Sequence, residues 1–229
     1  MVGSVGCYCI AIEWSCPDRQ LLHNHGTSRG ICLDPGPLSE HFPTFMAPDQ
    51  SFVVILSGPA LRRTIIRLAS QVLEAAHDPG QLLLLGIPNR GVPLAKVLAE
   101  ELGCLAGQVI EAGSLDPTFH RDDLRTVPTR LPRATVLPAP IDGREVVLVD
   151  DVLFTGRTAR AALDALLSWG NPRRVRLLVM VDRGHRELPL QADFVGRNVP
   201  TRRREFIRLH LRPTDPEEGV VLLPEAPAP

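Results

Sequence analysis

Residues 146–158 read Val-Val-Leu-Val-Asp-Asp-Val-Leu-Phe-Thr-Gly-Arg-Thr, and the fold of the chain is predicted outward from this stretch. Its first four apolar residues predict a buried strand with Asp150 and Asp151 at the carboxyl end. A Thr-Gly-Arg-Thr turn follows, and then a helix from about Thr158 to Ser168. Ligands of parallel α/β sheets lie beyond the carboxyl ends of the strands, where helix N-termini offer free N–H groups to anions. The stretch therefore predicts a phosphate site.

Length and composition set the class of protein. The 229 residues suffice for one domain with its own core, and a charged fraction of 22% is ordinary for a soluble protein. No apolar run reaches the roughly 18 residues that a membrane helix needs. Residues 1–30 lack the pattern of a signal peptide, so we expect a cytoplasmic protein. An odd count of 5 cysteines without such a signal argues against a disulfide framework.

Residues 1–45 differ from the rest of the chain. They contain most of the cysteines and three histidines, but no sustained hydrophobic period. A small zinc site is one interpretation, although the C-x-C and H-x-H spacings include no CxxC pair. The alternatives are a disordered tail, or sequence that is not translated, with Met46 as the true start. We expect the folded domain to span residues 46–223, followed by a frayed tail of residues 224–229.

Beyond this extension, strands and helices alternate. The alternation predicts an α/β domain with a mostly parallel central sheet flanked by helices, and a small hood built by the late strands. Strands are predicted at 52–56, 81–87, 108–114, 146–149, 175–181, 192–195 and 205–211, and helices at 59–77, 92–102 and 158–168. Gly103 is the expected C-cap of the second helix. Residues 115–124 are expected to include a further strand end, and the proline-rich residues 125–142 are expected to form a lid or a disordered segment.

Three turns should meet at one edge of the sheet, because parallel strands point the same way. They carry Asn89-Arg90-Gly91, Asp150-Asp151 with Thr155 to Thr158, and Asp182-Arg183. Backbone N–H groups and hydroxyls can cradle one phosphate, arginine can neutralise a second anion, and carboxylates can accept hydrogen bonds from ribose. Paired aspartates also follow strands in magnesium phosphatases and receiver-like domains. The combination of the three turns favours a sugar-phosphate ligand.

Residues 146–158 resemble the phosphoribosyl-pyrophosphate (PRPP) motif of type I phosphoribosyltransferases, in which an apolar strand, two acids and a Thr-Gly turn follow one another. A closer resemblance is to the PyrR family of pyrimidine-operon attenuation regulators, which are also uracil phosphoribosyltransferases. It is carried by residues 86–91, 115–124, 146–166, 181–189 and 193–201, and it covers about residues 56–211. The resemblance implies that the protein makes UMP and pyrophosphate from uracil and PRPP.

The resemblance also implies a role for each matching residue. Asp150 and Asp151 would hold the ribose hydroxyls, and Arg121 would close over pyrophosphate with the lid. Mg²⁺ would be bound through PRPP, with no direct protein ligand. The other contacts to PRPP or nucleotide would come from Asn89, Arg90, Val152, Leu153, Phe154, Thr155, Gly156, Arg157 and Thr158. Uracil would lie near Arg183 and the backbone of Val199.

The family's second role is UMP-dependent binding of the leader RNA of pyrimidine messengers. Positive charge remains at three of the positions that the family uses for this contact, Arg67, Arg186 and Arg197. At three others the usual threonine, histidine and arginine are replaced by Ile66, Ser70 and Gln191. Lost cations and hydrogen-bond donors weaken the binding of RNA phosphates.

The catalytic positions depart from the family pattern in three places, where Asn89, Pro117 and His120 replace the usual threonine, isoleucine and tyrosine. Two alternatives therefore stay open. One is a nucleotide-sensing RNA-binding regulator with weak catalysis, and the other is a phosphoribosyltransferase for another base, such as a purine. The expected partners are PRPP, uracil, UMP, UTP, the operon leader RNA and further copies of the chain in a dimer or tetramer.

Overall fold

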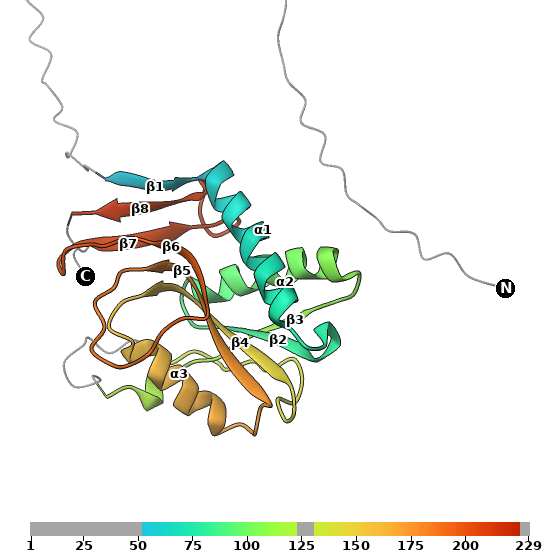
Figure 1. Cartoon of the computed structure of the whole chain (residues 1–229). Coiled ribbons are helices and arrows are strands. Elements are labelled where there is room, and N and C mark those ends of the chain that lie inside the picture. The colour runs from blue at the N-terminus through green and yellow to red at the C-terminus, as the bar shows by residue number, and fades with distance from the viewer. Residues whose placement is uncertain (1–51, 123–130, 225–229) are drawn as a thin grey trace, which may run out of the picture. The chain divides into compact units, whose positions relative to one another are not determined.

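The computed structural model describes residues 52–122 and 131–224 of the chain (Figure 1). The elements are β1 (Val53–Ser57), α1 (Gly58–Ala75), β2 (Leu82–Gly86), α2 (Gly91–Ala106), β3 (Glu111–Ser114), β4 (Glu145–Leu153), α3 (Arg157–Leu167), β5 (Arg174–Asp182), β6 (Phe194–Asn198), β7 (Phe206–His210) and β8 (Gly219–Leu223). Short 3₁₀ turns lie at Pro79–Gln81 and Thr118–His120. The predictions for residues 1–45, for the first part of the lid and for most of the C-terminal tail lie outside the described residues.

The central sheet is parallel throughout, with strand order β3-β2-β4-β5-β6. Alternate residues of its middle strands enter different cores. Leu84 and Val147 pack on the side of α1 and α2, whereas Leu83 and Leu148 pack on the side of α3. A sheet covered on both faces needs the continuous apolar runs that the sequence contains. The predicted α/β fold with flanking helices is confirmed, and no described helix is long and apolar enough to cross a bilayer.

The hood is a separate antiparallel sheet with strand order β1-β8-β7 (Figure 1). Its inward side chains, which include Leu56, Ile207 and Val220, join the core that α1 and α2 form with the central sheet. The first predicted strand and the last predicted strand both belong to this hood. The predicted strand at 192–195 instead pairs in parallel with β5 and closes the central sheet as β6. β8 was not predicted, because it lies within a tail whose composition is acidic and proline-rich.

Three local predictions are wrong. β4 continues to Leu153, so Asp150 and Asp151 lie inside the strand rather than after it. α2 continues through Gly103 to Ala106, because the intervening residues tolerate a helix, and Gly107 ends it with a φ of 67°. The segment at 115–122 contains a 3₁₀ turn instead of a strand end. Its described continuation pairs with the edge strand β3 through two backbone hydrogen bonds between Ser114 and Val136, of 2.8 and 2.9 Å.

A close approach of backbones joins the turn after β2 to β4. A Cβ atom added to Gly91 would lie 2.3 Å from the carbonyl oxygen of Val149, and one added to Gly86 would lie 2.5 Å from the carbonyl oxygen of Gly91. The N–H of Ile87 also donates to the Val149 carbonyl at 2.9 Å. Glycine at position 91 therefore lets the start of α2 lie directly against the strand that carries the two aspartates.

We expect Gly91→Ala to destabilise the protein by more than about 2 kcal/mol, because its methyl group would overlap backbone that cannot move aside. Gly107→Ala, at the other end of α2, is a matched control. It adds a Cβ at a positive φ but meets no atom within 4 Å, so it should cost about 1 kcal/mol. Urea unfolding measures both losses, and equal losses would contradict the role assigned to the contact at Gly91.

Candidate active site

The carboxyl ends of β2, β4 and β5 lie side by side, so the three predicted turns share one edge of the sheet. Backbone hydrogen bonds connect them. The N–H of Arg183 donates to the carbonyl of Leu153 at 3.0 Å, and the N–H of Val199 donates to the carbonyl of Asp182 at 2.8 Å. The structure therefore brings together the segments in which most of the predicted PRPP and uracil contacts lie.

The two aspartates of β4 differ in their surroundings. Asp150 is only 8% exposed, and its Oδ1 accepts the N–H of Asp151 at 2.9 Å. Burial raises the pKa of the Asp151 carboxyl, while its interactions with Asp150 and with the charge of Arg90 act in the opposite direction. Two carboxyl groups held beside each other in a partly buried strand suit hydroxyl groups or a hydrated cation brought by a ligand.

The turn from Thr155 to Thr158 leads directly into α3. Gly156 adopts a φ of 91°, which favours glycine, and its carbonyl accepts the N–H of Arg160 at 2.9 Å in the first turn of the helix. The carbonyl of Thr155 is held by the N–H groups of Glu187 and Leu188, at 3.0 and 3.3 Å. The N–H of Arg157 donates to Oγ1 of Thr155 at 3.4 Å. The first turn of α3 begins at this edge of the sheet, where helix N–H groups favour an anion.

Two arginines flank this turn. Nη1 of Arg121 donates to Oγ1 of Thr158 at 3.1 Å, so the residue predicted to close the lid does lie next to the predicted phosphate turn. Arg157 forms ion pairs with Glu187 at 3.1 Å and with Asp122 at 2.7 Å, and these acids raise the pKa of its guanidinium. The guanidinium of Arg157 is thus held beside acids at the rim of the turn.

The turn after β2 places Asn89 and Arg90 at the start of α2, with a cis peptide bond between Pro88 and Asn89. Arg90 pairs with Asp215, from the loop between β7 and β8. Sequence reasoning missed Asp215, because an acid in an acidic, proline-rich segment carries no local signal. Although burial acts to raise it, the hydrogen bonds from Arg90 and from the Leu211 backbone leave the pKa of Asp215 below its usual value.

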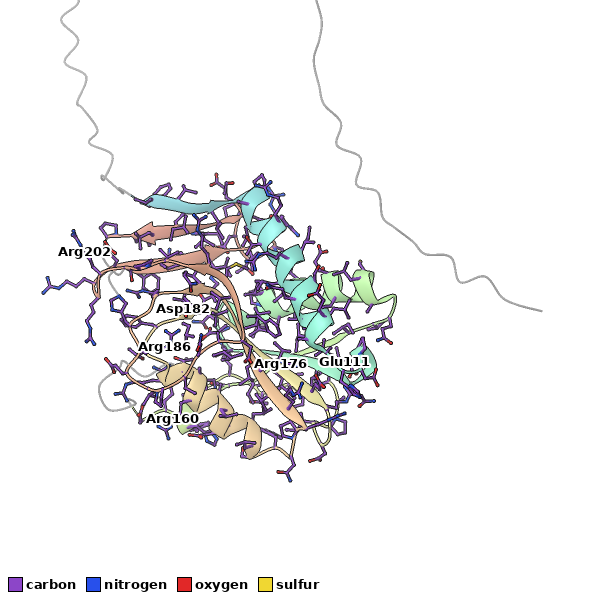
Figure 2. All side chains as sticks on the ribbon, viewed as in Figure 1. Glu111, Arg160, Arg176, Asp182, Arg186 and Arg202 are labelled. Atoms are coloured by element: carbon purple, nitrogen blue, oxygen red, sulfur yellow. The ribbon has the colours of Figure 1, made fainter. Side chains whose placement is uncertain are left out.

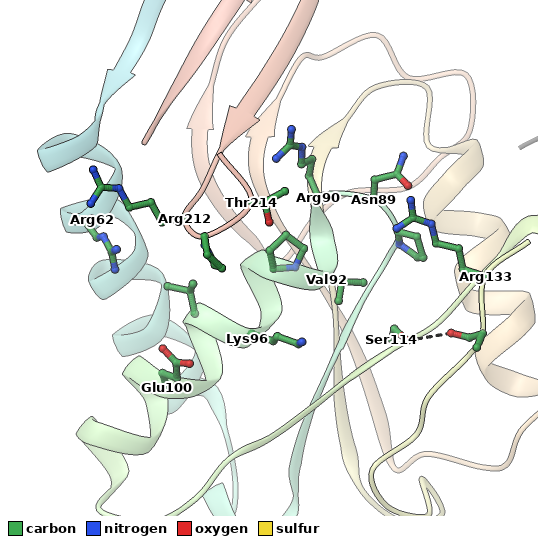
Figure 3. A pocket seen from close by; sticks show the side chains of 15 residues that line it. Arg62, Asn89, Arg90, Val92, Lys96, Glu100, Ser114, Arg133, Arg212 and Thr214 are labelled. Atoms are coloured by element: carbon green, nitrogen blue, oxygen red, sulfur yellow. Dashed lines mark hydrogen bonds between the residues drawn. The ribbon is translucent and has the colours of Figure 1, made fainter. Parts of the chain in front are cut away.

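A cavity of about 860 Å³ opens beside this turn (Figure 3). It lies between α2, the segment at 133–134 and the loop after β7. Its described lining has one acid, Glu100, and five cations: Arg62, Arg90, Lys96, Arg133 and Arg212. Arg62 and Arg90 are paired with Glu218 and Asp215. The other cations of the lining leave an excess of positive charge, which favours an anion near Asn89 and Arg90.

Arg183, predicted to lie near uracil, is 6% exposed. It donates to Oγ1 of Thr201 at 2.9 Å and to the carbonyls of Arg202 and Glu205 at 3.0 and 2.7 Å. Its guanidinium lies 4.1 Å from the centre of the Phe154 ring, and burial lowers its pKa. Arg183 therefore holds the segment after Val199 against Phe154, which shapes the wall of the site.

The three predicted RNA contacts lie in different surroundings. Arg67 of α1 donates to the Gly196 carbonyl of β6 at 2.6 Å, and Arg197 of β6 donates to the Ile55 carbonyl at 3.3 Å, so these two lie close to the same edge. Arg186 turns inward beside Asp182 (Figure 2). It donates to the carbonyls of Leu190 and Phe154 at 2.9 and 2.8 Å. Its contacts brace the loops of the site.

Metal-binding side chains do not gather in the described residues. No three of their His, Cys, Asp and Glu side chains are placed to hold one ion. The cysteines and histidines of residues 1–45 lie outside this part of the chain. At the sheet edge the donors available are the carboxylates of Asp150 and Asp151, which suit a cation that keeps water and phosphate oxygens among its ligands.

Comparison with known proteins gives the same fold. A solved hypoxanthine phosphoribosyltransferase from Trypanosoma cruzi superposes with a TM-score of 0.58 at 17% identity, over 74% of this chain and 94% of that chain. A hypoxanthine-guanine phosphoribosyltransferase from Bacillus anthracis gives a TM-score of 0.56 at 15% identity, over 74% and 96%. At such identities the likeness concerns the fold alone.

Sequence relatives are much closer. The bifunctional protein PyrR of Microcystis aeruginosa is 47% identical over 171 residues, which are 75% of this chain and 97% of that protein. Its counterpart in Streptomyces coelicolor is 50% identical over 176 residues, or 76% and 91%. The family model of the phosphoribosyl transferase domain matches residues 54–209. With the PRPP-type stretch on β4 and its neighbouring turns, these matches establish that the chain belongs to the PyrR family of phosphoribosyltransferases.

Proposed function

We propose that this PyrR-family protein transfers the phosphoribosyl group of PRPP to uracil, giving UMP and pyrophosphate in the cytoplasm. The observation that carries the proposal is the placement of Asp150 and Asp151 on the strand that leads into the Thr155–Thr158 turn, with Arg90 across the same edge. One site then offers groups for a ribose, a 5′-phosphate and a second anion. Family membership identifies the pyrimidine as the acceptor class.

Bond cleavage at C1 of the ribose leaves positive charge on the sugar and negative charge on pyrophosphate. The carboxylates of Asp150 and Asp151 are suited to hold the 2′ and 3′ hydroxyls and to lie near the cationic sugar. Burial makes this stabilisation stronger, because a partly desolvated carboxylate interacts more strongly with a nearby charge than one in water. Most of the acceleration in this account is electrostatic and positional.

Phosphate groups would be held at two places. The free N–H groups and hydroxyls from Thr155 to Thr158 would bind the 5′-phosphate, with Arg121 next to them. Asn89 and Arg90 would bind pyrophosphate beside the cationic cavity. Mg²⁺ bound to PRPP would supply charge neutralisation of the leaving pyrophosphate, and the small donor set at Asp150 and Asp151 fits a cation held mainly by substrate oxygens and water.

Uracil would lie near the buried Arg183 and the backbone of Val199. Arg183 already bonds three groups of the segment at 201–205. Its contribution in this account is to fix that segment, so that backbone groups near Val199 present hydrogen bonds to the base.

The proposal includes a second role, UMP-dependent binding of the leader RNA of pyrimidine genes. Its support is family membership together with Arg67 and Arg197, which lie at neighbouring places on α1 and β6. Ile66 on the same helix is 46% exposed and cannot hydrogen-bond to a phosphate or a base. Further copies of the chain, in a dimer or tetramer, would repeat this surface and extend the RNA contact.

Replacing Asp151 by asparagine should reduce UMP formation from uracil and PRPP by about 100-fold or more, because the neutral amide cannot stabilise the cationic sugar. The matched control is Asp164→Asn on the solvent side of α3, whose carboxylate is 41% exposed. That variant should keep its rate within about twofold. Full activity of Asp151→Asn would contradict the assignment of the acidic pair.

The same substitution should lower activity but raise the stability of the fold. The folded-state pKa of Asp151 is raised above its unfolded value, so ionisation of this carboxyl opposes folding, and stability is lost as pH rises through the folded-state pKa. Asp151→Asn should therefore melt at a higher temperature than the wild type at about pH 8, with a difference that shrinks toward about pH 4. Differential scanning calorimetry at the two pH values measures this. A constant difference, or a loss of stability at high pH, would contradict a buried carboxylate.

RNA binding is tested by a gel shift of the protein's own operon leader, with and without UMP. Arg67→Ala should weaken the UMP-dependent complex several-fold and lower its salt dependence by about one released ion, because one phosphate contact is lost. Arg174→Ala, at the exposed amino end of β5, is the control and should leave binding unchanged. A leader that is not shifted at low salt would leave the protein with the enzymatic role alone.

A further inference from the structure

Arg90 is held by a residue that is 125 positions away along the chain. Its Nη2 donates to Oδ1 of Asp215 at 2.9 Å, and its Nη1 donates to Oδ2. Asp215 lies in the loop between β7 and β8, so this pair connects the hood to Arg90, the N-cap residue of α2. The side chains are 25% and 10% exposed, which shields the pair from water. Bidentate arginine–carboxylate pairs of this kind are directional as well as strong.

Asp215 is itself fixed in place. Its Oδ2 also accepts the N–H of Leu211 at 2.9 Å, and its own N–H donates to the Leu211 carbonyl at 2.9 Å. Nδ1 of His210 lies 3.4 Å from its Oδ1. A carboxylate that is fixed by its own loop determines where a bound guanidinium lies, rather than following it.

A second acidic group, Asp151, lies within electrostatic reach of the same arginine. Burial raises the pKa of Asp151, and the positive charge of Arg90 is close enough to act against that shift. A buried carboxylate attracts a mobile guanidinium strongly, because an unpaired charge in that position is costly. Asp215 gives Arg90 a hydrogen-bonded partner on the hood side of the turn, beside the cationic cavity.

We propose that Asp215 is a positioning residue that keeps Arg90 on the pyrophosphate side of the turn and away from Asp150 and Asp151. The inference rests on the proposed function, in which Arg90 binds pyrophosphate. The pair uses two of the five N–H groups of the guanidinium, and three remain for an anion in the adjoining cavity (Figure 3). Asp215 has no contact with pyrophosphate in this account and acts through Arg90 alone. The hood thereby takes part in binding the leaving group.

The test is a double-mutant cycle on the full chain, with binding of pyrophosphate and Mg²⁺ measured by isothermal titration calorimetry. Asp215→Asn should weaken binding by about tenfold. Arg90→Ala should weaken it at least as much. The double variant should bind no more weakly than Arg90→Ala alone, because Asp215 has nothing left to position. A binding measurement requires neither turnover nor a base substrate. It therefore tests the pyrophosphate site whichever base accepts the phosphoribosyl group.

The matched control is Glu111→Gln, which breaks an ion pair with Arg144 at the amino end of the sheet, away from the cavity. It should change pyrophosphate affinity by less than about twofold. Asp215→Ser, which also removes the charge, serves as a second variant if Asp215→Asn does not fold, and the same tenfold loss is expected. Circular dichroism checks that each variant is folded at the titration temperature.

Unchanged affinity in Asp215→Asn would overturn the inference while leaving the proposed function in place. A double variant that binds about tenfold more weakly than Arg90→Ala would also overturn it, because Asp215 would then act independently of Arg90. A wild-type protein that binds no pyrophosphate would instead remove the proposed function, and this inference with it.

Discussion

The contact between the backbone of Gly91 and the carbonyl of Val149 is the constraint on which the rest of the site depends. It brings the turn after β2 against the strand that carries Asp150 and Asp151, at a distance that no side chain larger than hydrogen permits. The parallel register of β2, β4 and β5 then adds the Thr155–Thr158 turn and Arg183 to the same edge. The side chains and turns of this edge are therefore held in place by the sheet itself.

Burial shifts the pKa values of two ionisable groups at this edge of the sheet. Asp151 is buried enough to raise its pKa, and Arg183 is buried enough to lower its own. Each charge is offset differently. Arg183 bonds backbone carbonyls and lies over Phe154, whereas Asp151 has the charge of Arg90 within electrostatic reach. A carboxylate kept under such conditions is well suited to a cationic sugar, since the ligand relieves the cost that the free protein bears.

Much of the fold and the edge of the site could be predicted from the sequence, because both follow from local patterns. Apolar runs gave the strands of the central sheet, and the Asp-Asp and Thr-Gly signals identified β4 and its turn. The remainder depends on contacts between distant residues. Nothing near Asp215 indicates that it holds Arg90, and nothing near residue 219 indicates a strand, since β8 is completed only by pairing with β1 and β7. The positive charge of Arg186 led to its prediction as an RNA contact. In the structure its guanidinium donates to the carbonyls of Phe154 and Leu190, which the sequence alone does not indicate. The predicted end of α2 at Gly103 was wrong, because the sequence does not show which glycine adopts a positive φ. Gly103 lies within the helix, and Gly107 ends it.

The most direct measurement is a crystal structure of the protein with UMP. The account predicts the 5′-phosphate on the N–H groups from Thr155 to Thr158, the ribose hydroxyls against Asp150 and Asp151, and the uracil ring beside the backbone near Val199. A phosphate bound at the cationic cavity beside α2, with the ribose away from the acidic pair, would contradict the account.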